Sequence, residues 1–157
     1  MPRPKDSGRD DLFRLIHSLS KSEKRYFTLH AGKKEQSKYL QLFKLIQNQK
    51  VYNESAIKEK LKDDPMINNF HVAKKYLFEQ IMDSLILYHK EKNSSLKLKN
   101  ILLQIDICNK KGLSKISYKL LNNAEKLAIK NEKFNFLLEI LALKKINLMD
   151  RTHKGYE

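Results

Sequence analysis

The sequence predicts an all-α protein. Only 4 Gly and 3 Pro interrupt its 157 residues, so few positions break a helix. Apolar residues recur at intervals of three and four along most of the chain, and no apolar–polar alternation is long enough to indicate a β-strand. Since 41% of the residues are hydrophobic, the chain can bury a core of ordinary domain size.

The N-terminal part predicts a short tail and two helices. Residues 1–8 are polar, contain both Pro and Gly, and are expected to be a disordered tail. A first helix is expected over about Asp10–His17, with acidic residues at its positive end. Ser20 followed by Glu23 is a capping-box pattern. It predicts a second helix over Lys21–Ala31, which Gly32 would end.

Three further helices complete the predicted N-terminal helical bundle of residues 9–92. They are expected over Glu35–Gln49, over Glu54–Lys62 after an Asn53 cap, and over about Asn68–Lys90. The last has a regular apolar stripe of Phe70, Ala73, Leu77, Ile81 and Leu85. Further apolar residues, Val72, Tyr76, Met82 and Ile86, widen this stripe and predict neighbours on more than one side.

The polar stretch from Lys90 to Ser95 predicts a boundary, after which helical hairpins are expected over residues 96–150. The first hairpin helix ends at Gly112. The second has an apolar face of Ile116, Leu120, Leu121, Ala124, Leu127 and Ala128. The third is predicted to have an apolar face of Phe134, Leu137, Leu138, Leu141 and Leu148.

The stretch KKGLSKISYKLLNNAEKLA resembles the middle of a tetratricopeptide repeat. Gly112 falls at that family's turn glycine, Ala124 at a small position of its second helix, and Leu121 and Leu127 at apolar positions. Ser117 replaces another usual alanine, and Ile101 stands where the family prefers Trp. The resemblance implies a tetratricopeptide-like array of antiparallel hairpins after the N-terminal bundle. Together with SLSKSEKRYF and KKYLFEQIMDSL, the hairpin is also similar to a group of longer, uncharacterised bacterial helical-repeat proteins, which implies interaction scaffolding without a known active site.

The net charge of +14, from 32 basic and 18 acidic residues, favours a polyanionic partner. Candidate phosphate contacts are Lys21, Lys24 and Arg25, with Tyr26 available to stack on a base. In a helix-turn-helix interpretation of residues 40–90, Lys74 and Lys75 would join them. The alternative, which we favour, is a capped helix whose aromatic residues are core and whose lysines are solvated.

No pattern of reactive residues predicts an enzyme, a cofactor or a metal site. The five histidines have no zinc-ligand spacing, and no phosphate-binding glycine loop occurs. Asp63–Asp64 abuts Pro65 and is expected to form a turn, and Cys108 lies on an apolar stripe. A single Cys and the lack of an apolar N-terminal segment favour the cytoplasm, with no membrane association.

The sequence therefore predicts a non-enzymatic protein-interaction module with a protein or peptide partner. The alternative is a basic nucleic-acid-binding protein that makes mostly sequence-independent phosphate contacts. The helix of residues 134–148 is either a closing cap or part of a longer array. In the second case its apolar face would be partly bare, and self-association through it is expected.

Overall fold

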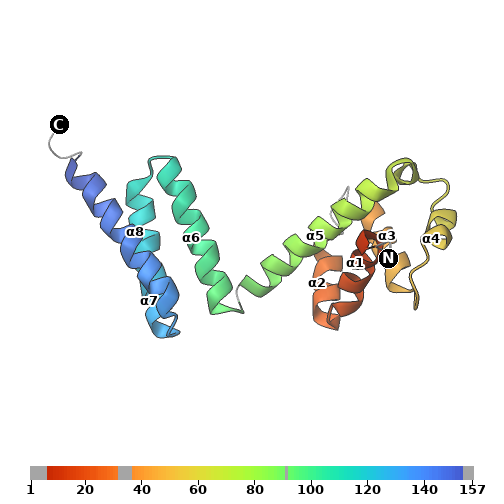
Figure 1. The fold of residues 1–157 in the computed structure, drawn as a ribbon, viewed down its shortest axis with the longest axis horizontal. Coiled ribbons are helices and arrows are strands. Elements are labelled where there is room, and N and C mark those ends of the chain that lie inside the picture. Colours follow the sequence, from red (N-terminus) through yellow and green to blue (C-terminus); the bar gives the residue numbers. More distant parts are fainter. Residues whose placement is uncertain (1–6, 32–36, 91, 154–157) are drawn as a thin grey trace, which may run out of the picture. The chain divides into compact units, whose positions relative to one another are not determined.

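The structure, a computed structural model, describes residues 7–31, 37–90 and 92–153, and all of the regular structure in these ranges is helical (Figure 1). The all-α prediction is confirmed. The elements are α1 (Ser7–Ser18), α2 (Lys21–Ala31), α3 (Ser37–Gln47), α4 (Glu54–Lys60), the 3-10 helix η1 (Pro65–Asn69), α5 (Phe70–Lys90), α6 (Ser94–Lys110), α7 (Ser114–Lys130) and α8 (Phe134–His153). Contacts divide the chain into two compact units, Met1–Tyr88 and His89–Glu157.

Several predicted boundaries differ from those of the structure, and α3 and α4 each end two residues before the predicted Gln49 and Lys62. Helix α1 begins at Ser7, so two residues of the expected tail are helical, and residues 1–6 lie outside the described residues. The long helix expected from about Asn68 begins at Phe70, and Asn68 and Asn69 belong to η1, at whose start the Asp64 carboxylate accepts a hydrogen bond from the Met66 backbone N–H at 2.8 Å. Gly32 and the start predicted at Glu35 also lie outside the described residues.

Short-range hydrogen bonds begin two helices where the sequence predicts them. Ser20 N–H donates to Glu23 Oε2 at 2.7 Å, and Glu23 N–H donates to Ser20 Oγ at 3.3 Å, which is the reciprocal capping box. Asn53 Oδ1 accepts from the Ala56 N–H at 3.0 Å and caps α4. The Gln49 side chain also holds the Asn53 backbone, accepting from its N–H at 3.0 Å and donating to its carbonyl at 2.8 Å. Hydrogen bonds therefore tie Asn53 both to the chain before it and to the first turn of α4.

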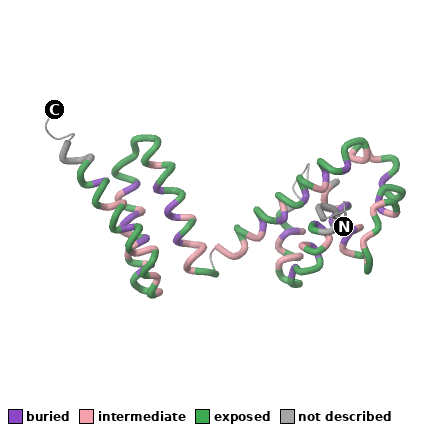
Figure 2. Tube along the Cα trace, viewed as in Figure 1, coloured by how far each residue is buried: buried purple, intermediate pink, exposed green. Residues whose placement is uncertain are grey.

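The first unit has one hydrophobic core (Figure 2). Its fully buried side chains come from α1, α3, α4 and α5, and they are Ile16, Leu42, Phe43, Ile46, Ile57, Leu77 and Ile81. Phe27 of α2 packs against Phe43 with the ring centroids 4.8 Å apart. The core stripe predicted on α5 is buried except for Leu85, which is half-buried. The residues predicted to widen that stripe are exposed, with Val72 at 50% and Ile86 at 55%, so a second covered side is not found.

The second unit is a run of three helices in which α6 packs on α7 and α7 packs on α8. Its core residues are Leu98, Ile101, Leu102, Ile105, Leu121, Ala124, Ala128 and Ile140. Both turns have the same form. Gly112 has φ +69° and Leu113 N–H donates to Cys108 O at 2.8 Å, whereas Glu132 has φ +54° and Lys133 N–H donates to Ala128 O at 2.8 Å. These are two Schellman-type helix ends, one of which has a non-glycine residue at its left-handed position.

The apolar face predicted for the third hairpin helix is partly bare, as in one of the two alternatives above. Of its five residues, Phe134, Leu138, Leu141 and Leu148 are exposed, and only Leu137 packs against the core. The face that α8 buries contains Ile140 and Asn147 instead. The hydrophobic pattern did not predict this face, because one of its buried residues, Asn147, is polar. The Asn147 side chain donates a hydrogen bond to Ser117 of α7.

Among the described helices, none combines the length and the apolar character needed to cross a bilayer.

Candidate functional site

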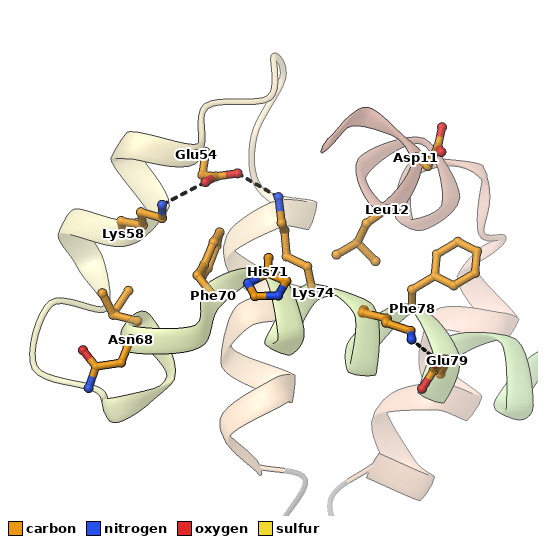
Figure 3. Close-up of a pocket in the computed structure, with 12 residues that line it drawn as sticks. Asp11, Leu12, Glu54, Lys58, Asn68, Phe70, His71, Lys74, Phe78 and Glu79 are labelled. Atoms are coloured by element: carbon orange, nitrogen blue, oxygen red, sulfur yellow. Dashed lines mark hydrogen bonds and ion pairs between the residues drawn. The ribbon is translucent and has the colours of Figure 1, made fainter. Parts of the chain in front are cut away.

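An open pocket of about 790 Å³ lies in the first unit, where α1, α4, η1 and α5 meet (Figure 3). Its lining mixes acidic, basic, aromatic and aliphatic side chains: Asp11, Leu12, Glu54, Lys58, Ile67, Asn68, Phe70, His71, Lys74, Lys75, Phe78 and Glu79. Three carboxylates and three lysines balance in charge. The pocket therefore has no excess positive charge for a polyanion.

Glu54 at the first turn of α4 is the centre of the polar network in this pocket. Its Oε1 lies 2.9 Å from Lys58 Nζ, and its Oε2 accepts from Lys74 Nζ at 2.7 Å (Figure 3). The Tyr52 hydroxyl also donates to Oε2, at 3.1 Å. Lys74 and Glu54 are only 12% and 20% exposed. One carboxylate therefore joins α4 to α5 through a shielded ion pair.

Aromatic rings complete the surroundings of the two lysines. The ring of Phe70 lies between them, with its centroid 5.3 Å from Lys58 Nζ and 5.4 Å from Lys74 Nζ. Lys74 Nζ is also 5.6 Å from the centre of the Tyr52 ring. These distances are those of cation–π contacts, which strengthen as the cation loses water. The cluster thus holds Lys74 in place by charge, hydrogen bonds and ring contacts at once.

The pKa of Glu54 falls from its ordinary value of 4.5 to about 2. Partial burial by itself would raise this pKa. The hydrogen bonds from Lys74 and Lys58, the charge of Lys74 and the Tyr52 hydroxyl outweigh that effect. Glu54 therefore stays ionised through the neutral range. The arrangement holds α4 against α5.

The predicted phosphate contacts on α2 differ in how far they are exposed to solvent. Lys21 and Arg25 are exposed and Lys24 is half-buried. Tyr26 is already engaged: it stacks on His30 with ring centroids 3.9 Å apart and meets Tyr88 edge-on at 5.2 Å. A base could not take that stacking position without displacing His30.

The two predicted contacts on α5 differ from each other. Lys75 is 78% exposed, with its Nζ 3.9 Å from Glu79 Oε1. Lys74, which we predicted as a phosphate contact, forms an ion pair with Glu54 and is largely buried. The helix-turn-helix interpretation is also not supported by the connection between α4 and α5, which contains η1 rather than a tight turn. Phe70, at the start of the supposed recognition helix, is buried.

The residues that carry the tetratricopeptide resemblance lie in the second unit. Leu121 and Ala124 are completely buried, Leu127 packs against the core, and Gly112 occupies the left-handed position of the α6–α7 turn. Cys108 is half-buried, and in the described part of the chain no group of His, Cys, Asp and Glu is arranged to hold a metal ion.

An exposed apolar stripe on α8 is the second candidate site. We call it the α8 stripe and define it as Phe134, Leu138, Leu141 and Leu148. The exposed fractions of these residues are 63%, 71%, 44% and 51%. Their intervals of four, three and seven residues place them on one side of the helix. The sequence pattern identified these four residues as part of one apolar face and left open whether that face is covered or partly bare.

The chain matches no known protein family, and comparison with curated proteins and with solved structures finds no similar protein.

Proposed function

We propose that the chain is a non-enzymatic protein-interaction module whose hairpins are tetratricopeptide-like and whose docking surface is the α8 stripe. The observation that carries this proposal is the exposure of four large apolar side chains along one side of a helix. A soluble partner that covers such a stripe gains the free energy of burying apolar surface, roughly 25 cal/mol for each Å² removed from water.

The pocket around Glu54 supports a non-enzymatic role. Its central carboxylate, Glu54, forms ion pairs with Lys58 and Lys74 that join α4 to α5, which is a structural use of the charge. The hairpin order α6–α7–α8 supports the repeat-like proposal, because sequential helices pack on one another and a glycine turn separates the first two.

A titration with a synthetic amphipathic helix, followed by NMR of the isotope-labelled protein, tests this function. We expect the largest shift changes on α8, and we expect Leu138→Ser to abolish them. Leu103→Ser is the matched control, because Leu103 is also an exposed leucine, at 58%, but lies on α6. Shift changes spread evenly over both units, or equal effects of the two variants, would contradict the proposal.

Nucleic-acid binding is the second candidate function. The observation that favours it is the exposure of Lys21 and Arg25, which lie one turn apart on α2 in a chain of net charge +14. The pair offers phosphate contacts without base readout, so the binding would be insensitive to sequence and sensitive to salt.

A further inference from the structure

We propose that the α8 stripe pairs with an amphipathic helix of another protein, and that this helix carries a carboxylate facing Lys145. This inference rests on the proposed function and specifies the chemistry of the partner. It follows from the spacing of the stripe, from the surroundings of Lys145, and from the charge of the chain.

The spacing of the α8 stripe is that of a coiled-coil seam. Phe134, Leu141 and Leu148 are seven residues apart, and Leu138 lies between the first two, at intervals of four and three. Such a pattern keeps apolar side chains facing one partner helix over successive turns. The next position in this series, seven residues after Leu138, is Lys145. The seam therefore has one cation in place of an apolar residue.

Lys145 has no carboxylate partner among the residues whose side chains the structure describes. The residues three and four positions away on the same helix are Leu141, Ala142, Leu148 and Met149, all of them uncharged. Lys145 is exposed, and no ion pair to it occurs among the described residues. The adjacent Lys144 is the contrast, because it is 17% exposed and bound to Glu125 of α7. A helix that covers the stripe must bring a charge for Lys145 or bury it unpaired, which is costly.

A second copy of the chain would pair poorly with the α8 stripe. Parallel pairing in register would place Lys145 against the same lysine of the copy. Antiparallel pairing would place it against apolar residues, since the stripe contains no acidic residue. Each copy also has a net charge of +14, which opposes close approach. An acidic amphipathic helix is complementary both to the lysine in the seam and to the chain as a whole.

The test compares synthetic helices of about four heptads that differ at one central seam residue, which is Glu, Gln or Lys. Two sets of helices are made, and the variable residue occupies one seam position of the heptad in the first set and the other seam position in the second. The two sets allow for parallel and antiparallel docking. Affinities for the full chain are measured by calorimetry. We expect the Glu helix to bind about tenfold more tightly than the Gln helix. We expect Lys145→Gln to remove that ratio and Lys145→Glu to reverse it in favour of the Lys helix.

Lys119→Glu is the charge-matched control, because Lys119 is an exposed lysine of α7 outside the seam. If it changed the ratio as much as Lys145→Glu does, overall charge would explain the preference, and the inference would fail. If the Glu and Gln helices bound equally and Leu138→Ser still abolished binding, the inference of a carboxylate facing Lys145 would fail. The proposed function as an interaction module would stand. No binding by any helix would overturn both. A dimer in sedimentation equilibrium that Leu138→Ser abolishes would make the occupant a second copy and overturn the inference.

Discussion

Asn147 of α8 donates a hydrogen bond from Nδ2 to Oγ of Ser117 on α7, at 3.2 Å, and both side chains are buried. The pair lies in the interface between two helices that also share aliphatic contacts and the Lys144–Glu125 ion pair. It joins residues 30 positions apart in the sequence. Each side chain therefore depends on the other for its only hydrogen bond to a side chain in the described structure.

Removal of one member of this pair should cost more than removal of both. Ser117→Ala leaves the Asn147 amide buried without its acceptor, and we expect a loss of about 1–3 kcal/mol in the free energy of unfolding. The double variant Ser117→Ala/Asn147→Leu should recover most of that loss, because neither polar group remains. Urea unfolding of both single variants and the double variant measures the coupling. Additive losses would show that the hydrogen bond does not couple the two residues.

The two turns of the second unit predict opposite effects of glycine. Glu132→Gly should stabilise the protein by roughly 1 kcal/mol, because glycine adopts a positive φ without the steric cost that Glu132 bears. Gly112→Ala should destabilise it by a similar amount. No heavy atom lies within 4 Å of a Cβ built on Gly112, so backbone conformation alone causes the loss. Thermal unfolding of both variants is the measurement, and Gly112→Asn should lose less than Gly112→Ala because Asn tolerates this conformation.

The ion pairs of Glu54 predict a specific dependence of stability on pH. The folded-state pKa of about 2 lies below the ordinary value of 4.5, so the pairs stabilise the fold above about pH 4.5. This contribution, on the order of 1–3 kcal/mol, is lost as the pH falls toward 2. Glu54→Gln should therefore be destabilising at pH 7, and its difference from the unsubstituted protein should shrink as the pH falls to 3.

Glu59→Gln is the matched control for that experiment, because Glu59 is an exposed glutamate on the same helix. It should change stability little at either pH. A deficit of Glu54→Gln that is the same at pH 7 and at pH 3 would mean that its carboxylate is not what stabilises the α4–α5 contact.

The basic surface of α2 predicts salt-dependent binding if the second candidate function is correct. Fluorescence anisotropy with mixed-sequence duplex DNA and single-stranded RNA should then show affinity at about 50 mM salt that collapses by about 200 mM. Lys21→Ala/Arg25→Ala should weaken it, while Lys74→Ala should not act through phosphate contact, because Lys74 already binds Glu54. Absence of binding at the lower salt concentration would remove this candidate.

The features that the sequence predicts well are those that depend on near neighbours. The capping box of Ser20 and Glu23 and the Asn53 cap are formed by residues three positions apart, so their pattern is complete within one helical turn. The α5 core stripe is equally local, because a single helix presents it.

The features that the sequence did not predict depend on distant partners. The ion pair of Lys74 was not predicted because its partner, Glu54, lies 20 positions away in the sequence. The buried face of α8 was missed because Asn147 is a core residue only when Ser117 faces it. Glu132 adopts a left-handed conformation at a position where the usual glycine signal is absent. Hydrophobic periodicity cannot identify any of these.

The separation of the two cores has a consequence for how the chain folds during synthesis. Every residue of the first core, from Leu12 to Ile81, precedes the second unit. Helical domains with local contacts fold within microseconds to milliseconds, whereas a ribosome adds only about 5–20 residues per second. The first core can therefore close while the second unit is still being made. The α8 stripe is therefore synthesised after the first core has closed, so the two apolar surfaces are not exposed in unfolded chain at the same time.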